Sequence, residues 1–281
     1  MERRCLTITS WLFIPGNNTR ALNKIHAQLE ADYFIIDLED AVPIAEKSVT
    51  RKNVQDFMTN NPTSKKVYLR INSIDSNLYE DDLKNINMKL FKGVILSKCE
   101  NATQVKIIED LLTTQSVTPC IIPLIETVNG YYNLQEILKE GSVERIAFGA
   151  IDMANEFDIA GDNLIDNPLL NEMRITMALL SKRFNKQAPL DAPCIFIDRL
   201  SVLQQESEFA KKIGYYGKLA IHPKQLETIA NVFSYSEEEI KLANEVVEIY
   251  EHNNYKTISY KNIMIDTPVY LRMKKILEES E

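Results

Sequence analysis

The chain has 281 residues, of which 45% are hydrophobic and 26% are charged, values that fit a globular protein and argue against disorder. The formal net charge of −8 argues against a nucleic-acid-binding protein, although a few local cations could still hold an anionic small ligand. No apolar run approaches the ~18 residues of a membrane span.

Cysteine usage and the N-terminal stretch both favour a cytoplasmic protein. The four cysteines are scattered without a CxxC pair, which is typical of reduced thiols: Cys5, Cys99, Cys120 and Cys194. The first residues are basic and then briefly apolar, but Pro15-Gly16 interrupts them and no small-residue cleavage site follows. We therefore expect no signal peptide.

Short apolar segments alternate with helical patterns along the chain. The predicted strands span residues 10–14, 33–36, 67–69, 93–96, 120–125, 145–148, 188–190 and 218–221. The predicted helices span residues 19–29, 44–60, 78–87, 101–112, 130–139, 167–184, 200–213, 225–232 and 236–251, and a last helix spans 269–279. Short, β-branched, nearly continuous apolar strands are typical of a parallel sheet that is buried on both faces.

The spacing of the units predicts a closed barrel. Polar residues mark the strand ends at positions 37, 70, 98, 126, 152, 191 and 222, with gaps of 33, 28, 28, 26, 39 and 31 residues. A TIM barrel needs about 30 residues per strand–helix unit. A doubly wound open sheet would alternate in the same way, but eight units without a GxGxxG fingerprint favour the barrel. We predict an α/β fold: a TIM (β/α)8 barrel over residues 1–252 and a C-terminal helical arm over 253–281.

The strand ends carry most of the chemistry that the sequence offers. In a parallel barrel all strand C-termini open on one face, where the active site lies. Here that face would carry Asp37, Glu39, Asp40, Arg70, Asn72, Lys98, Glu126, Asp152, Asp191 and His222. The alternative interpretation is that each strand merely exits to solvent there, where a charge is tolerated.

Two of these carboxylates predict a metal site. Glu126 and Asp152 follow adjacent strands, and two carboxylates with waters and ligand oxygens are the usual environment of Mg²⁺. Mn²⁺ could take the same place. Zn²⁺ is disfavoured because the three histidines, His26, His222 and His252, are not at ligand spacing.

The basic residues of this face have two interpretations each. Arg70 could bind a carboxylate or an enolate oxygen, or it could form a structural ion pair with Asp37 or Glu39. Lys98 could be a Schiff-base nucleophile, but the surrounding carboxylates favour a protonated ion-pair partner. His222, which precedes Pro223, is more typical of a hydrogen-bonded structural residue than of a catalyst.

Eight stretches of the chain resemble the citrate lyase β-subunit-like family of the HpcH/HpaI aldolase superfamily, and their motifs are most similar to those of citramalyl-CoA and malyl-CoA lyases. They follow the family order over nearly the whole chain. The stretches are SWLFIPG (10–16), ADYFIIDLEDAV (31–42), LRIN (69–72), LSKCE (96–100), IPLIET (122–127), FGAID (148–152), GKLAIHP (217–223) and MIDTP (264–268).

The resemblance implies more than the pattern alone. It implies a TIM barrel with Mg²⁺ on Glu126 and Asp152, Arg70 on the substrate, and a homotrimer. It also implies that the arm contacts a neighbouring subunit, where Asp266 would serve as the catalytic acid or base. From the residues alone, Asp266 would be an ordinary acid at a helix N-terminus.

The resulting hypothesis is Mg²⁺-dependent cleavage of a 3-hydroxyacyl-CoA, such as citramalyl-CoA or malyl-CoA, to acetyl-CoA and a 2-keto acid. Supporting residues around the metal would be Glu39, Asp40, Asp37 and Lys98, and the candidates for the CoA phosphates are Arg20, Lys24, Lys47 and Arg51. Four alternatives remain open. They are a citrate lyase β subunit within a complex, an HpaI-like aldolase on free hydroxy-keto acids, a thioester-hydrolysing relative and an inactive binding protein.

Overall fold

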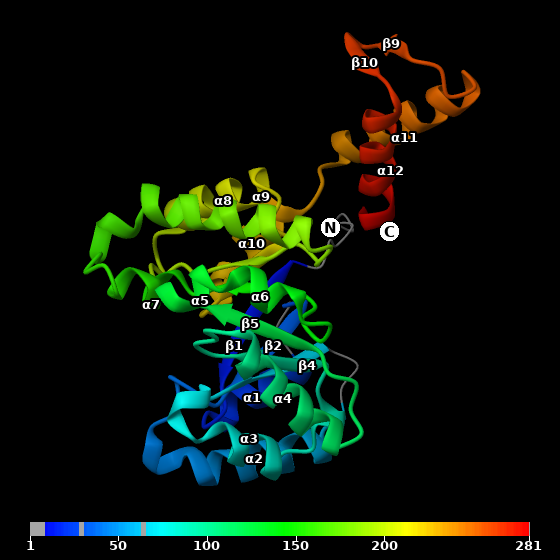
Figure 1. Ribbon diagram of the computed structural model, residues 1–281. Helices are drawn as coiled ribbons and strands as arrows, with labels where there is room; N and C mark the ends of the chain where they lie inside the picture. Colours follow the sequence, from blue (N-terminus) through cyan, green and yellow to red (C-terminus); the bar gives the residue numbers. More distant parts are fainter. Residues whose placement is uncertain (1–8, 28–30, 63–65, 281) are drawn as a thin grey trace. The chain divides into compact units, whose positions relative to one another are not determined.

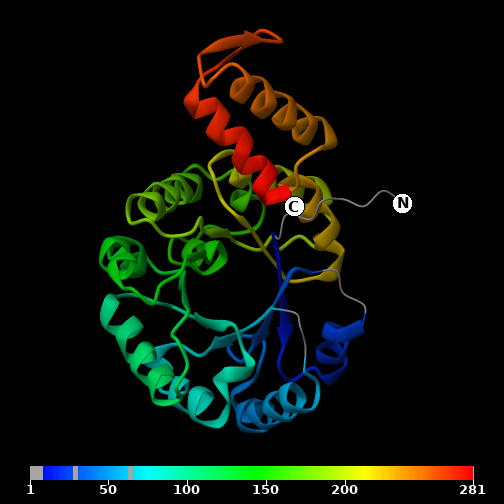
Figure 2. The ribbon, with the colours of Figure 1, turned by 90° about the vertical axis from the view of Figure 1, so that its right-hand side faces the viewer.

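The computed structural model describes residues 9–27, 31–62 and 66–280, which form two compact units, Thr9–Val232 and 233–280. The first unit is a closed parallel barrel of eight strands in sequence order. The strands are β1 Ser10–Pro15, β2 Tyr33–Asp37, β3 Lys66–Ile71, β4 Gly93–Leu96, β5 Ile121–Ile125, β6 Ala147–Phe148, β7 Leu190–Asp191 and β8 Gly217–Ala220. Figure 2 looks into this barrel, whose helices form a ring outside the strands.

Strand pairing closes the barrel between its first and last strands. β1 pairs with β2 (Trp11 opposite Tyr33) and also with β8 (Ser10 opposite Lys218), so both edges of the sheet are hydrogen-bonded. The prediction of a TIM barrel is thereby confirmed, including the weak seventh strand. That strand is only two residues long, and its pairing with β6 and β8 keeps the ring closed.

Most helices of the barrel lie where the pattern predicted them, but the short helix α7 was not predicted (Figure 1). The helices are α1 Thr19–Ala27, α2 Lys47–Asn60, α3 Tyr79–Asn85, α4 Ala102–Thr114, α5 Val128–Tyr132, α6 Leu134–Lys139, α7 Ala150–Asn155, α8 Pro168–Arg183, α9 Leu200–Lys212 and α10 Leu226–Phe233. Asn101 caps α4, since its Oδ1 accepts the Gln104 N–H at 3.0 Å. The helix predicted over residues 130–139 is instead two helices that meet at Asn133.

The second unit is a helical hairpin with a small sheet. α11 (Glu237–His252) packs on α12 (Thr267–Ser280), and β9 (Ile258–Tyr260) pairs with β10 (Ile263–Ile265). Val246, Tyr250, Ile265 and Tyr270 form its core. The sequence predicted neither the pairing nor the hairpin turn, in which Lys261 and Asn262 both have positive φ, as a type I′ turn requires.

The boundary between the two units differs from the expected one. The predicted barrel domain ended at residue 252, whereas the chain divides after Val232. The reason is that α11 buries its apolar face against α12 and β10, so it belongs to the second unit. The arm thus has a core of its own.

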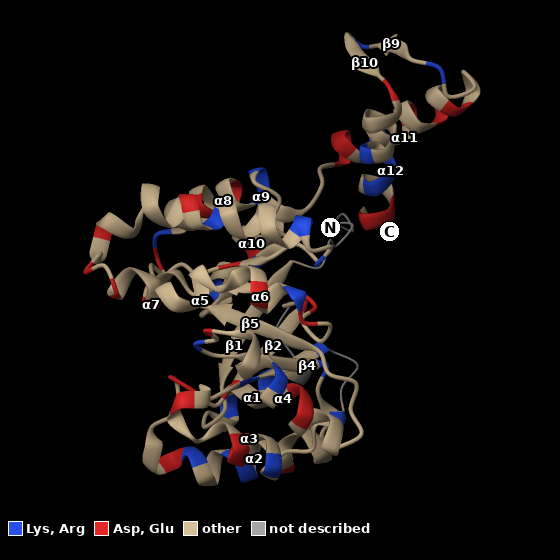
Figure 3. Cartoon of the chain, viewed as in Figure 1, with Lys and Arg blue, Asp and Glu red and all other residues tan. Residues whose placement is uncertain are grey.

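Charges are distributed along the helices of both units. Figure 3 shows basic and acidic segments interspersed on the ribbon. Within the described ranges, no helix is long and apolar enough to span a bilayer.

Candidate active site

Asp37 and Arg70 form the centre of the predicted face. They end neighbouring strands and lie opposite each other in the β2–β3 register. The Arg70 guanidinium donates to both Asp37 oxygens, from Nε to Oδ1 at 2.7 Å and from NH2 to Oδ2 at 2.6 Å. Asp37 also accepts the backbone N–H groups of Glu39 and Ala41. The predicted ion pair between Arg70 and Asp37 is therefore present. It fixes the plane of the guanidinium and leaves NH1 facing the other charged residues at the strand ends.

The third nitrogen of Arg70 faces two acidic side chains. Its NH1 lies 3.1 Å from Glu39 Oε2 and 3.7 Å from Asp40 Oδ2. Lys98 Nζ approaches the other Glu39 oxygen at 3.5 Å, which is the ion-pair role expected for this lysine. Glu39 is buried, whereas the Asp40 side chain is 56% exposed. The charged residues at these strand ends therefore form one connected electrostatic cluster.

Glu126 is seated between backbone groups of two flanking strand ends. Its Oε1 accepts the Lys98 N–H at 2.7 Å, and Lys98 adopts the left-handed conformation with a φ of 48°. On the other side lies Gly149, whose neighbour Phe148 pairs with Ile125 in the β5–β6 register. A Cβ atom at Gly149 would stand 2.3 Å from Glu126 Cβ and 2.7 Å from Oε2. The carboxylate thus fills a cradle that exists because residue 149 has no side chain.

Burial and neighbouring charges shift the proton equilibria of this cluster. Burial raises the pKa of Glu126 to about 8, with Glu39 and Asp152 adding to the rise and Arg70 opposing it. Burial likewise raises the pKa of Glu39 to about 7 against the attraction of Arg70. Burial alone would lower the pKa of Lys98, but the surrounding carboxylates, Glu39 foremost, raise it, so the ammonium stays charged.

The cluster has a surplus of negative charge that fits a divalent cation. Its members are five carboxylates and two cations: Asp37, Glu39, Asp40, Glu126 and Asp152 with Arg70 and Lys98. Full ionisation gives a net charge of −3 (2 − 5). The oxygen donors of Glu126 and Asp152 suit Mg²⁺ or Mn²⁺, which would fill their remaining coordination positions with waters and substrate oxygens.

Asp152 lies on a different element from the one predicted. The pattern placed it just past the sixth strand, but β6 ends at Phe148 and Asp152 lies in the first turn of α7. Its charge still contributes to the raised pKa of Glu126 and of Lys98, so Asp152 lies within electrostatic reach of both.

Two residues expected at the CoA phosphates have internal partners instead. Lys47 is buried, and its Nζ donates to Leu38 O, Glu39 O and Asn72 Oδ1, which uses all three ammonium protons. Arg51 is also buried and pairs with Asp82 Oδ1 at 2.7 Å. Both are corrections to the prediction: burial of these cations holds the loops after β2 and β3 in place.

The other two candidates for CoA contacts remain compatible with that role. Arg20 and Lys24 lie on α1, and both are exposed. Asn72, which the strand-end pattern also selected, is buried and donates to Asp82 Oδ2 and Leu38 O. It supports the β3 loop from inside.

The last two strand ends have structural roles. Asp191 is fully buried and binds Arg174 Nε at 2.7 Å and Lys218 Nζ at 2.5 Å. Burial alone would raise the pKa of Asp191, but Arg174 and Lys218 outweigh it and hold the pKa below the usual range. His222 accepts the Lys224 N–H at Nδ1 and caps the short helix Pro223–Gln225, as the structural interpretation predicted, and it is partly buried.

Asp266 lies in the second unit, at the start of α12. Its Oδ1 accepts the Val269 N–H at 3.1 Å, so in this unit it is the N-terminal acid that its sequence context suggested. The side chain is partly exposed.

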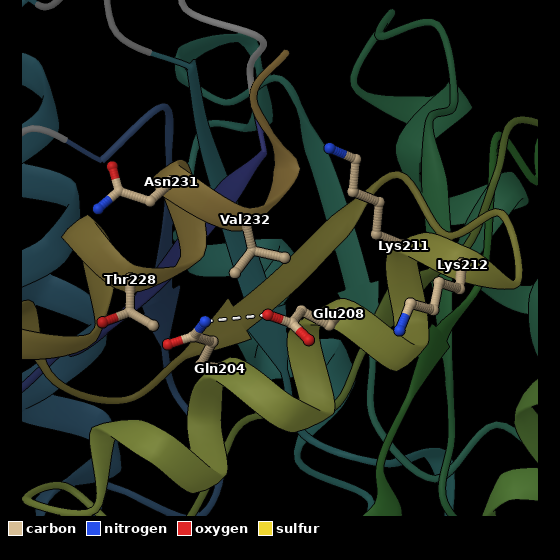
Figure 4. Close-up of a pocket in the computed structure, with 7 residues that line it drawn as sticks. All are labelled: Gln204, Glu208, Lys211, Lys212, Thr228, Asn231 and Val232. Atoms are coloured by element: carbon tan, nitrogen blue, oxygen red, sulfur yellow. Dashed lines mark hydrogen bonds between the residues drawn. The ribbon is translucent and has the colours of Figure 1, made fainter. Parts of the chain in front are cut away.

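A separate groove lies on the outside of the barrel between α9 and α10 (Figure 4). It holds about 470 Å³ and is lined by polar side chains, among them Gln204, whose Nε2 donates to Glu208 Oε1 at 2.9 Å. None of the strand-end residues lines it. The groove is therefore not part of the candidate active site.

Sequence reasoning missed the residues that act through their backbone or through burial. Gly149 was visible only as part of a motif, and nothing in the pattern said that it borders Glu126. The internal role of Lys47 follows from the fold of the loop after β2. A signal for Gly149 did exist in the sequence. The predicted strands 120–125 and 145–148 are consecutive, and the residues that follow the ends of paired strands, here Glu126 and Gly149, are neighbours.

Two models of known protein families match this chain. The description "HpcH/HpaI aldolase/citrate lyase" matches residues 9–223, and "C-C_Bond_Lyase of the TIM-Barrel fold" matches residues 166–281.

Three curated relatives span most of the chain. The (3S)-malyl-CoA thioesterase of Cereibacter sphaeroides is 29% identical over 89% of this chain and 86% of its own length. The citrate lyase subunit beta of Leuconostoc mesenteroides is 28% identical, covering 95% and 91%. The mitochondrial citramalyl-CoA lyase of Homo sapiens is 29% identical, covering 92% and 81%.

Solved structures share the fold. A citrate lyase beta subunit of Mycobacterium tuberculosis, complexed with oxaloacetate and magnesium, matches with a TM-score of 0.68 and 25% identity, covering 82% of this chain and 98% of that one. The CitE protein of the same organism, in complex with magnesium, acetoacetate and coenzyme A, has a TM-score of 0.77 and 22% identity, covering 98% and 99%. With the family match over most of the barrel, the chain belongs to the HpcH/HpaI aldolase/citrate lyase family and is a lyase.

Proposed function

We propose that this lyase cleaves a 3-hydroxyacyl-CoA of the citramalyl-CoA or malyl-CoA type, with Mg²⁺ as cofactor, to acetyl-CoA and a 2-keto acid. The observation that carries the proposal is the arrangement of an Asp37-oriented Arg70 beside the Glu126–Asp152 carboxylates at the mouth of a barrel of this family. Relatives named for citramalyl-CoA and malyl-CoA support the substrate class, and structures named with magnesium and coenzyme A support the cofactor and the thioester.

The reaction breaks one carbon–carbon bond. A base removes the proton of the 3-hydroxyl group, the bond between the second and third carbons breaks, and its electron pair moves onto the thioester as an enolate. The third carbon becomes the keto carbon, and protonation of the enolate gives acetyl-CoA. Mg²⁺, when bound by Glu126 and Asp152, would act as a Lewis acid for the substrate oxygens.

The residues of this chain then divide the work. Arg70 NH1 would stabilise the enolate oxygen, since Asp37 already fixes the guanidinium plane. Asp266 of a neighbouring subunit would exchange the proton at the hydroxyl oxygen. Glu39 and Asp40, which lie beside Arg70 NH1, would hold water at the rim. Arg20 and Lys24 would contact the CoA phosphates.

The test is direct. Purified protein with Mg²⁺ should release acetyl-CoA from citramalyl-CoA, malyl-CoA or citryl-CoA, and EDTA should abolish the release. Failure with all three thioesters would contradict the proposal.

The same assay separates the closest alternative activities. Release of free CoA and malate from malyl-CoA would favour the thioesterase that one relative is named for. Activity only on a citryl thioester of an acyl-carrier protein would favour a citrate lyase β subunit. Activity on free hydroxy-keto acids without CoA would favour an HpaI-like aldolase.

Assembly requires its own experiment. If Asp266 acts on a neighbouring subunit in a homotrimer, mixing Asp266→Ala with Glu126→Ala protomers should restore part of the activity that each variant lacks. Sedimentation should give a trimer. Absence of restoration after verified subunit exchange would place the acid or base elsewhere. A cytoplasmic location also remains a prediction.

A further inference from the structure

The groups that surround Glu126 restrict how its carboxylate can bind a cation. One oxygen, Oε1, is occupied by the Lys98 N–H at 2.7 Å. The other, Oε2, lies against the open side of Gly149, on the strand end that leads to Asp152. The side chain is only 2% exposed, so it has little room to rotate.

The two backbone segments beside the Glu126 carboxylate, at Lys98 and Gly149, are themselves fixed. Lys98 holds its N–H in place with a left-handed backbone (φ 48°), which is unfavourable for a residue with a side chain. Gly149 is anchored at the barrel wall, because its N–H donates to Ile125 O at 2.9 Å and its carbonyl accepts the Met153 N–H at 3.1 Å. Neither backbone segment can move aside without breaking pairing at the end of β5 or the start of α7.

We propose that Gly149 is a positioning residue: the space that it leaves lets Glu126 sit with Oε1 on the Lys98 N–H and with Oε2 as the metal-binding oxygen, and this placement favours Mg²⁺ and Mn²⁺ over Ca²⁺. Mg²⁺ binds carboxylates through one oxygen in compact octahedral geometry, whereas Ca²⁺ takes more and longer bonds and often both oxygens of a carboxylate. With Oε1 already accepting the Lys98 N–H, two-oxygen binding would have to share that oxygen between the cation and the hydrogen bond, which weakens both interactions. The inference rests on the metal site of the proposed function.

Gly149→Ala tests the proposal without altering any charge. Its Cβ would stand 2.3 Å from Glu126 Cβ, so the carboxylate must shift. Gly141→Ala is the matched control, because a Cβ there meets nothing within 4 Å. Mn²⁺ binding to the full-length protein, measured by electron paramagnetic resonance, gives a readout independent of activity.

The expected results are specific. Wild-type protein and Gly141→Ala should bind Mn²⁺ with similar affinity, and Mg²⁺ should displace it at concentrations at least about tenfold lower than Ca²⁺. Gly149→Ala should weaken Mn²⁺ binding by about 10- to 100-fold, as loss of a group that orients a metal ligand usually does. A folded Gly149→Ala protein with wild-type Mn²⁺ affinity, or a wild-type protein that binds Ca²⁺ as well as Mg²⁺, would overturn the proposal.

A second measurement covers the case in which Gly149→Ala does not fold. Infrared difference spectra of wild-type protein labelled with ¹³C-glutamate, recorded with and without Mg²⁺, report whether one or both oxygens of Glu126 bind the metal. The same spectra of Glu126→Gln serve as the control that lacks this carboxylate. A wide separation of the two carboxylate stretches supports one-oxygen binding, and a narrow separation contradicts it. If Glu126→Gln binds Mn²⁺ like the wild type, the metal site itself is wrong and both proposals fail. If only the Gly149 comparison fails, the proposed function stands.

Discussion

Two charged clusters at the strand ends of the barrel differ in their balance of charge. At the end of β7 and β8, Asp191 and Glu206 face Arg174 and Lys218, so two carboxylates meet two cations. At the ends of β2 to β6, five carboxylates meet only two cations.

The consequence of that difference appears in the proton equilibria. The balanced cluster keeps the pKa of Asp191 low although burial would raise it, whereas in the unbalanced cluster burial and repulsion raise the pKa of Glu126 to about 8. A balanced buried cluster has all its charges compensated within the protein and serves the fold. A surplus of one sign is unfavourable for the isolated protein and prepares it for a ligand of the opposite charge.

The largest effect is expected in the unbalanced cluster. Glu126→Gln removes a metal ligand and keeps the volume and the Lys98 N–H partner, so activity should fall by about 10³-fold or more, or about 4 kcal/mol. In the metal-free protein near pH 6, where Glu126 of the wild type is protonated, the melting temperature should change little. The assay is steady-state acetyl-CoA release at saturating Mg²⁺. Activity within tenfold of the wild type would mean that Glu126 does not hold the cofactor.

The balanced cluster should respond in the opposite way. Asp191→Asn removes the carboxylate that Arg174 and Lys218 share and leaves Glu206 to face both buried cations, which should lower the free energy of unfolding by about 3–5 kcal/mol. The folded fraction should retain most of its activity, because the ion pairs of Asp191 join it to Arg174 and Lys218 and not to the residues assigned to the metal or the substrate. Urea unfolding and an assay at low temperature give both values. Unchanged stability with lost activity would move Asp191 into the active site.

The pH dependence of stability should distinguish the unbalanced cluster. In the folded protein the pKa values of Glu39 and Glu126 are raised to about 7 and about 8, so between roughly pH 4.5 and 8 the folded state binds more protons than the unfolded state. The contribution of these groups to stability is present at low pH and is lost as the pH rises through the folded pKa values. Metal-free wild-type protein should therefore lose stability with rising pH relative to Glu126→Gln.

Mg²⁺ should reverse that loss. It binds the ionised carboxylates, so the increase in melting temperature that it produces should grow from pH 6 to pH 8.5 in the wild type and be absent in Glu126→Gln. Thermal unfolding in EDTA and in Mg²⁺ measures both trends. A Mg²⁺ effect that is constant over this range would contradict the raised pKa values.

The smallest effect is expected from the exposed cations of α1. Replacing Arg20 and Lys24 by alanine should raise the KM for the CoA thioester by about two- to fivefold, and the effect should shrink with added salt. Lys52→Ala, an exposed cation on α2, is the control and should leave KM unchanged. Equal effects of the three changes would show that α1 has no special role.

The sequence by itself determined the eight-unit barrel, because strand length, β-branched composition and the repeat of about 30 residues are local properties that few folds satisfy. It also indicated the main groups of the unbalanced cluster, since parallel strands bring their ends to one face. Asp37 opposite Arg70 follows from two strand ends that lie in register.

Only the tertiary structure decided which charges are available. Lys47 and Arg51 resemble Arg20 in the sequence, yet both are buried against internal partners. Asp191 resembles Glu126, yet its charge is compensated by ion pairs with Arg174 and Lys218. The sequence could not reveal the division after Val232 or the hairpin between α11 and α12, because both depend on which apolar faces meet. Gly149 illustrates the general reason: its contribution is the space beside Glu126, and such space exists only after two strands have paired.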